Sequence, residues 1–192
     1  MTQFPMSPEP ARRVRPAVVT ASSGLLVLVV VLMLINVVLG IVANNDEVKE
    51  ATKEFTDLQE GGISSGLQQG VSYAATAIFA LIFLVLAALN LRGNRVSRII
   101  TWIFGGVGAV CCACSVISQG AMGALLGATG EDVKDAYDRL TGAYPSWYMP
   151  ATIALSILTI LALVTALILL ALPAANAYFR KAQPEWTPPP QM

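Results

Sequence analysis

Four long blocks without a charged residue constrain this chain more than any other feature of its sequence. They cover residues 17–43, 70–91, 99–119 and 150–172. A helix rises ~1.5 Å per residue and the hydrocarbon core of a bilayer is ~30 Å thick, so ~20 apolar residues suffice to cross it. Only 12% of the 192 residues are charged, which is too little polar sequence to cover four buried helices in a soluble domain. The sequence therefore predicts an all-α membrane protein whose four transmembrane helices form an antiparallel bundle.

The residue types that are missing exclude several classes of function. The chain has no histidine, and its formal net charge is zero. Histidine-dependent triads and metal sites are therefore excluded, and the net charge offers no general attraction to nucleic acid. The four blocks also lack Asp, Glu, Lys and Arg, the side chains that mark proton relays and ion-coupled transport. We predict no catalytic, cofactor-binding or metal-ligating residue.

Charges between the blocks predict the orientation of the chain in the membrane. The segments 1–16 and 173–192 and the link that holds Arg92, Arg95 and Arg98 are all net positive, whereas the loops 44–69 and 120–149 are net negative. Lys and Arg near membrane spans stay on the cytoplasmic side. We therefore expect a multi-pass protein with both termini in the cytoplasm and the two acidic loops outside.

The ends of the chain have a different composition from the transmembrane domain, 17–172. Residues 1–16 are rich in Pro and Arg, and residues 173–192 are rich in Pro. Such segments bury little apolar surface, so we expect two disordered cytoplasmic tails. The first block could also be a signal peptide after a basic start, but it is far longer than the usual ~7–15-residue apolar region. We predict an uncleaved membrane anchor.

Each acidic loop contains a short stretch with helical periodicity. Apolar residues recur on one helical face in both loops, at Val48, Ala51, Phe55 and Leu58 in the first and at Val133, Ala136, Tyr137 and Leu140 in the second. Anionic head groups should repel the acidic opposite faces. We therefore expect the two amphipathic helices to pack on each other as an extracytoplasmic cap.

Glycines and capping residues predict where these two helices begin and end. Asn44 with Glu47 resembles a capping box, and Gly61–Gly62 is a natural stop. The second helix should start at Thr129 or Gly130 and end at Gly142. Residues 62–70, rich in Gly, Ser and Gln, are expected to form a flexible return to the second span.

Polar side chains within the spans are candidates for contacts between helices. Asn36 is the most polar residue deep in the first span, and an unpaired amide in lipid costs several kcal/mol. We expect it to face the bundle and to bond a hydroxyl of another span, drawn from Ser115, Ser118, Thr152, Ser156 and Thr159. The alternative is that these residues line a polar passage for a solute.

Small residues and cysteines cluster in the third span. Gly105 and Ala109 form a small-xxx-small pair that lets a neighbouring helix approach closely. The cluster Cys111, Cys112 and Cys114 matches neither zinc-ligand nor redox spacing, so we interpret the cysteines as packing residues. The aromatic residues Tyr144, Trp147 and Tyr148 precede the fourth span. They are typical of a membrane-interface belt, although they could recognise a lipid head group or a glycan.

Four stretches of sequence carry a resemblance that covers most of the chain. They are RPAVVT at 15–20, LRGNRVSRIITWIFGG at 91–106, YPSWY at 144–148, and FRK at 179–181 with WTPP at 186–189. Together they resemble a group of uncharacterised four-span membrane proteins of high-GC Gram-positive bacteria (actinobacteria). The resemblance implies a bacterial plasma membrane and carries over no functional residue.

These features favour a non-catalytic accessory or scaffold protein of the cell envelope. Its partners would be the lipid bilayer and other membrane proteins or further copies of itself. The alternative is an oligomeric small-solute channel or exporter, and a membrane enzyme ranks third because no catalytic constellation is visible. A polar, water-filled passage through the bundle would favour the channel, whereas a dry core of small residues would favour the scaffold.

Overall fold

The computed structural model describes residues 16–58, 65–126 and 130–179. In these ranges the chain forms helices and no strand. The helices are α1 (Ala17–Ala43), α2 (Asp46–Asp57), α3 (Ser65–Leu91), α4 (Arg95–Leu126), α5 (Glu131–Ala143), α6 (Tyr148–Ala171) and α7 (Pro173–Phe179). Four of them, α1, α3, α4 and α6, are long and apolar enough to cross a membrane. The predicted all-α four-helix membrane bundle is confirmed.

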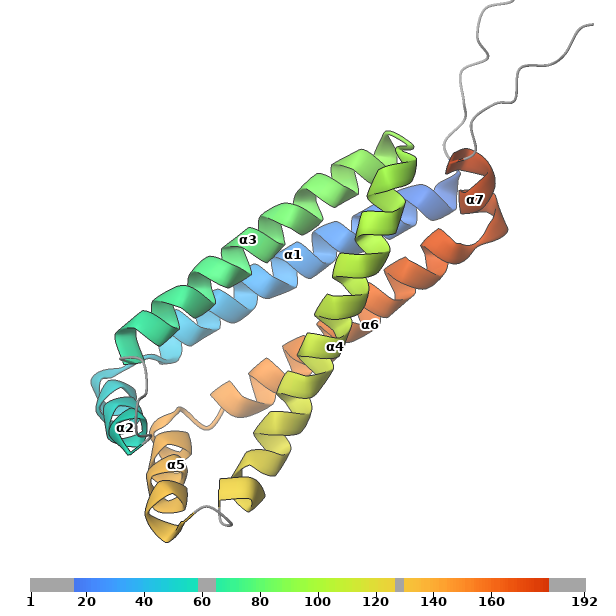
Figure 1. Cartoon of the computed structure of the whole chain (residues 1–192). Helices are drawn as coiled ribbons and strands as arrows, with labels where there is room; N and C mark the ends of the chain where they lie inside the picture. Colours follow the sequence, from blue (N-terminus) through green and yellow to red (C-terminus); the bar gives the residue numbers. More distant parts are fainter. Residues whose placement is uncertain (1–15, 59–64, 127–129, 180–192) are drawn as a thin grey trace, which may run out of the picture.

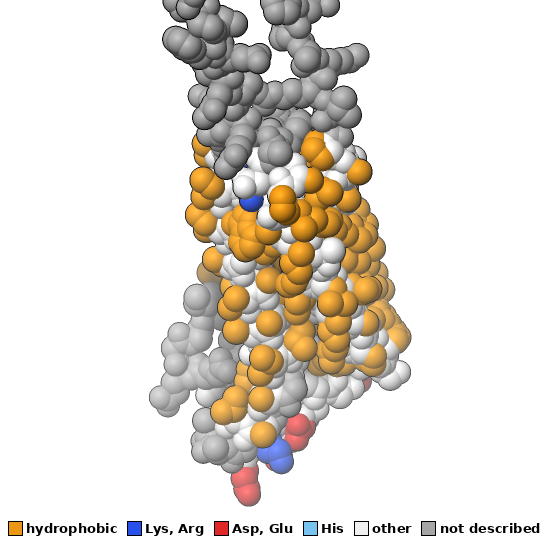
Figure 2. Space-filling view, turned by 90° about the vertical axis from the view of Figure 1, so that its right-hand side faces the viewer, with side chains coloured by type: hydrophobic (Ala, Val, Ile, Leu, Met, Phe, Trp, Pro, Cys, Tyr) orange, Lys and Arg blue, Asp and Glu red, His pale blue; other side chains and the backbone are white. Residues whose placement is uncertain are grey.

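The four long helices run antiparallel, with α2 and α5 at one end of the molecule and the α3–α4 turn and α7 at the other (Figure 1). α1 packs against both α3 and α6, and α4 packs against α6. We call the end formed by α2 and α5 the acidic end, and the end formed by the α3–α4 turn and α7 the basic end. Apolar side chains cover most of the surface between the ends in Figure 2, and acidic side chains gather at one of them.

Local sequence signals explain how the chain turns at both ends. Gly93 adopts a φ of 73°, a left-handed conformation that favours glycine and ends α3. The Asn94 side chain then accepts a hydrogen bond from the Val96 N–H at 3.1 Å. At the acidic end, the Asn45 side chain caps α2 by accepting from the Val48 N–H at 2.8 Å. The predicted cap at Asn44 is wrong by one residue, because Asn44 still closes the last turn of α1.

Several helices extend beyond their predicted limits. α3 begins at Ser65, so the predicted flexible return over 62–70 is wrong from that residue onward. Each glycine there costs ~1 kcal/mol in a helix, but hydrogen bonds that Gln69 makes with Asn44 and Tyr73 hold the first turns. α4 continues past residue 119 to Leu126. In this stretch Ala, Met and Leu, which are good helix formers, outnumber the two glycines.

The C-terminal segment also begins with a helix. We expected a tail from residue 173, but Pro173–Phe179 form α7, and a proline suits the first turn of a helix because its missing N–H is not needed there. Ala175 and Phe179 bury Val19 of α1. The predictions for residues 1–15 and 180–192, Gly61–Gly62 and Thr129 lie outside the described residues.

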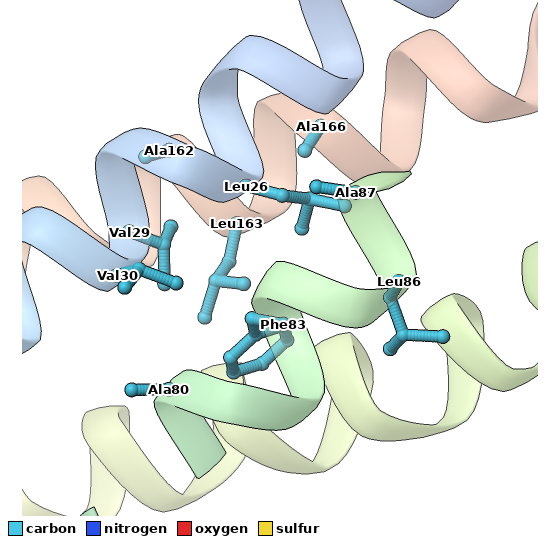
Figure 3. Packing of buried hydrophobic residues seen from close by; sticks show 10 residues of the cluster. All are labelled: Leu26, Val29, Val30, Ala80, Phe83, Leu86, Ala87, Ala162, Leu163 and Ala166. Carbon is cyan, nitrogen blue, oxygen red and sulfur yellow. The ribbon is translucent and has the colours of Figure 1, made fainter. Parts of the chain in front are cut away.

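The apolar core lies in the half of the bundle nearer the basic end (Figure 3). Leu26 and Val29 of α1 meet Phe83 of α3 and Leu163 of α6, all nearly inaccessible to solvent. Small residues allow this close approach: a Cβ built on Gly105 would lie 3.0 Å from a methyl carbon of Leu167.

A buried polar cluster fastens α3 to α4 at the basic end. The Asn90 amide donates to the Thr101 hydroxyl at 3.0 Å and accepts from the Ser97 hydroxyl at 2.8 Å. All three side chains are at most 1% exposed. Nearby, Arg98 donates to Asn176 of α7 at 2.9 Å and lies over the Phe179 ring at 5.8 Å.

Candidate functional site

A large cavity occupies the half of the bundle nearer the acidic end. Its volume is about 1080 Å³, at the upper limit of typical small-molecule sites. All four long helices and both α2 and α5 contribute to its lining. More than half of the lining residues carry a hydroxyl or an amide. Leucine, methionine and valine side chains lie between these polar groups, so the lining favours an occupant that has both polar and apolar parts.

The cavity ends near the middle of the bundle. Its deepest lining residues include Leu32 on α1 and Thr159 on α6. Val30 and Ala162, within one helical turn of these, already belong to the apolar core. Beyond them Phe83 and Leu163 are only 2% and 1% exposed. The described structure therefore forms a chamber that closes inside the bundle.

The five polar residues predicted to join helices all line this cavity. They are Asn36, Ser115, Thr152, Ser156 and Thr159. The hydroxyls of Ser115, Thr152 and Thr159 donate to carbonyl oxygens of their own helices, at 2.8 to 3.0 Å, as hydroxyls in helices commonly do. Ser118 behaves in the same way.

Asn36 does not make the predicted bond across the bundle. Its side chain is half-buried and forms no hydrogen bond to another described residue. The prediction is wrong because the helices that carry the candidate partners diverge toward the acidic end (Figure 1). The amide is therefore left facing the cavity, together with the hydroxyls meant to satisfy it.

Three tyrosines form part of the cavity rim. A Cβ built on Gly40 would lie 3.5 Å from the Tyr73 hydroxyl and 3.7 Å from the Tyr148 hydroxyl, so glycine here leaves room for both. Tyr144 stacks on Tyr148 with ring centroids 4.6 Å apart. Burial, and then the neighbouring Tyr73, raise the pKa of Tyr144 above its ordinary value. The phenol of Tyr144 thus stays neutral and able to donate a hydrogen bond.

Two amides tie the rim together between α1 and α3. The Asn44 amide donates to the Gln69 side-chain oxygen at 3.3 Å, and the Gln69 amide donates to the Tyr73 hydroxyl at 3.2 Å. This chain of hydrogen bonds orients the Tyr73 hydroxyl beside Gly40.

α2 and α5 pack on each other over the cavity, as predicted. The Phe55 and Tyr137 rings lie 6.0 Å apart, and Arg139 donates to Glu54 at 2.8 Å. Val48 is 2% exposed, but Leu58, at the end of the predicted apolar stripe, is 42% exposed. The packing of the two acidic-end helices is confirmed, and its apolar seam ends before Leu58.

Charged residues of both signs occupy the exposed surface of α2. The helix carries five carboxylates and two lysines, and only the lysines, Lys49 and Lys53, line the cavity. Lys49 forms an ion pair with Asp46 at 2.8 Å. The hydrogen bond from Lys49, and then its charge, hold the pKa of Asp46 below the usual value.

The small residues and cysteines of the third span have separate positions. Gly105 lies against Leu167 of α6 and Ala109 against the apolar core. Cys112 lines the cavity, whereas Cys111 and Cys114 are exposed. The interpretation as packing residues is therefore wrong for these two within a single chain. Among the described residues, no group of His, Cys, Asp or Glu side chains is placed to hold a metal ion.

Sequence reasoning missed Asn90 as the amide that joins two spans. The available signal was its position: it lies at the end of an apolar block, just before the Gly93 turn, so it can reach the start of the next helix. Asn36 was predicted to be that amide instead, because it lies deeper in an apolar block.

Comparison of the chain with known family models, curated proteins and solved structures finds no match. The geometry of the cavity is therefore the main guide to function.

Proposed function

We propose that this chain is a non-catalytic accessory protein of the bacterial plasma membrane that binds a small polar or amphiphilic molecule in the cavity at its acidic end. Both termini would lie in the cytoplasm and the acidic end outside. The polar cavity within an otherwise apolar bundle carries the proposal. The resemblance to actinobacterial four-span proteins and the position of the arginines support the membrane and the orientation.

The composition of the cavity lining supports binding rather than catalysis. Hydroxyls, amides and three clustered tyrosines supply many neutral hydrogen-bonding groups. A few convergent polar groups in a pre-formed pocket are typical of binding sites. Neither a carboxylate nor a histidine is among the described lining residues, so the hydroxyls there have no adjacent general base of the usual kind.

Blocking the rim tests the binding function. In full-length protein purified in mild detergent, native mass spectrometry should detect a bound species, and Gly40→Leu should reduce its occupancy at least about tenfold. The added side chain would fill the space between the Tyr73 and Tyr148 hydroxyls. Gly106→Leu is the matched control, because nothing lies within 4 Å of a Cβ built there. Equal occupancy in both variants, or an empty wild-type protein, would rule out a binding role for the cavity.

A small-solute exporter is the second candidate. Thr152, Ser156 and Thr159 share one side of α6 and lead from the rim toward the middle of the membrane. To release a solute on the other side, the core around Phe83 and Leu163 would have to open. Proteoliposomes distinguish the two functions: solute flux that Gly40→Leu abolishes supports an exporter, whereas binding without flux supports the accessory role.

Cysteine labelling tests the orientation. In a variant with the three native cysteines replaced by Ala, we expect Gly142→Cys on whole cells to react with a membrane-impermeant maleimide. Asn94→Cys should react only after the membrane is permeabilised. Both positions are exposed, so burial does not confuse the comparison. If only Asn94→Cys were labelled on intact cells, the orientation would be the opposite of the one proposed.

A further inference from the structure

We propose that the occupant of the cavity is an anionic glycerophospholipid. Its phosphate would lie beside Lys49 and Lys53, and its acyl chains would pass between α3 and α4 into the bilayer. This inference rests on the proposed binding function and assigns a chemical class to the ligand.

The charged side chains that line the cavity are positive. Lys49 and Lys53 lie four residues apart, so both project from one side of α2. They are the charged residues among the described lining, which includes no carboxylate of α2 or α5. Lys49 also pairs with Asp46, which lies outside the lining. Thr52 and Thr56 line the cavity from the same helix, but their hydroxyls donate to the carbonyl oxygens of Val48 and Thr52 at 2.6 and 2.7 Å. The lysines are therefore the donors that α2 offers to a phosphate oxygen.

The outer surface of the same two helices argues against an anion that arrives from water. α2 and α5 together carry nine carboxylates and four basic side chains. A surface with this excess of negative charge lowers the local concentration of free anions. A lipid avoids this barrier because it reaches the lysines from within the membrane.

We place the lateral entrance between α3 and α4, which lie close together only in part of their length. Near the basic end the helices are fastened by the Asn90 cluster, and further along Phe79 meets Phe104 with ring centroids 6.4 Å apart. Beyond this contact the two helices diverge toward the acidic end (Figure 1). Thr76 on α3 and Ser115 on α4 both line the cavity at this level.

The remaining lining is mixed, as an amphiphile requires. Leu32, Met33 and Val37 give the cavity an apolar wall on α1. Asn36 interrupts this wall with an amide, and the tyrosines of the rim stand between it and α2. A glycerol backbone with ester carbonyls presents acceptors to these donors, while its chains need the apolar wall and the bilayer.

Lipid binding by the full-length protein in detergent tests the assignment. The probes are dioleoylphosphatidylglycerol, dioleoylphosphatidylcholine and soluble glycerol 3-phosphate, each titrated and followed by native mass spectrometry. We expect phosphatidylglycerol to bind at least about tenfold more tightly than phosphatidylcholine, and glycerol 3-phosphate not to compete. The variant Lys49→Gln/Lys53→Gln should lose about tenfold or more in phosphatidylglycerol affinity, since it removes two positive charges that attract the anionic head group.

Lys134→Gln is the matched control, because Lys134 is exposed on α5 and does not line the cavity. Its affinity should change less than about twofold. Equal binding of the two lipids, or equal losses in the control and the double variant, would overturn the anionic assignment while leaving the cavity a binding site. Competition by glycerol 3-phosphate would instead identify a soluble phosphate ligand. Unchanged phosphatidylglycerol binding in Gly40→Leu would contradict the proposed function itself.

Discussion

The two halves of the bundle are built from the same four helices and differ in almost everything else. Toward the basic end, Leu26, Phe83 and Leu163 interlock, and Asn90 has partners for its amide. Toward the acidic end the helices separate, and Asn36 faces a cavity. Helix association in a membrane depends on close van der Waals packing. The closed half thus holds the molecule together, and the open half is free to bind.

Residue size accounts for this difference. Gly105, Gly108, Ala162 and Ala166 lie where α4 and α6 meet their neighbours in the closed half, and small residues let helix backbones approach. The open half has tyrosines, methionines and hydrogen-bonding side chains at the corresponding levels. Such bulky side chains keep the helices apart, and the hydrogen-bonding groups among them need polar partners.

The largest expected effect is truncation of the closed core. Phe83→Ala should lower the free energy of unfolding by about 3 kcal/mol, the lower end of the range for Phe→Ala, because lipid as the alternative solvent reduces the hydrophobic transfer contribution. Leu32→Ala, which only widens the cavity, should cost less than about 1 kcal/mol. Reversible unfolding in mixed micelles measures both. Equal losses would mean that the two halves contribute alike to stability.

The next effect concerns the two asparagines. Asn90→Ala should destabilise the protein by about 2 kcal/mol, since it removes two buried hydrogen bonds and leaves a void. Asn36→Ala should change stability by less than about 0.5 kcal/mol because its amide has no described partner to lose. The same unfolding assay applies. A larger cost at Asn36 would show that the open half is also held by polar contacts.

A smaller effect is expected where the acidic-end helices meet. Phe55→Asp should cost about 1 to 2 kcal/mol locally, because the half-buried ring packs on Tyr137 and a carboxylate there would be poorly solvated. Hydrogen exchange in nanodiscs should show faster exchange in both α2 and α5, with the core around Phe83 unchanged. Faster exchange in α2 alone would mean that the two helices are stable independently.

The smallest effect is expected for the exposed ion pair between Arg139 of α5 and Glu54 of α2. Arg139→Gln should change the stability of the acidic end by no more than about 0.5 kcal/mol, because Arg139 and Glu54 are 67% and 49% exposed and surface pairs contribute little. Raised salt should have the same small effect on the wild-type protein. A loss comparable with that of Phe55→Asp would give the ion pair, rather than the rings, the main role.

The sequence predicted the elements well because charge and periodicity are local signals. Uncharged blocks located the four long helices, and the stripe from Val48 to Phe55 located α2. The side of a helix that faces the bundle is harder to predict: Leu32 is 8% exposed and lines the cavity, whereas its apolar neighbour Val31 is 44% exposed. A helix that is apolar on every side gives no periodic signal for its buried face.

The cavity itself could be predicted only as a set of residues. Asn36, Thr152, Ser156 and Thr159 were recognised as polar and inward-facing, but whether two helices meet or separate at that level depends on packing summed over the whole bundle. That Lys49 and Lys53 line the cavity could not be predicted either, because the acidic composition of α2 suggested a uniformly acidic face. Only the packing of α2 against α5 determines which side turns toward the cavity.

The contact of α7 with α1 has a mechanical consequence. Because Phe179 and Ala175 lie on Val19, the first and last described helices leave the bundle at the same end. Tension applied to both ends would peel α7 from α1 first and then separate the helices from that end, one contact after another. The chamber at the far end would be the last part to feel the load, so stretching the tails would leave its shape intact until the core had parted.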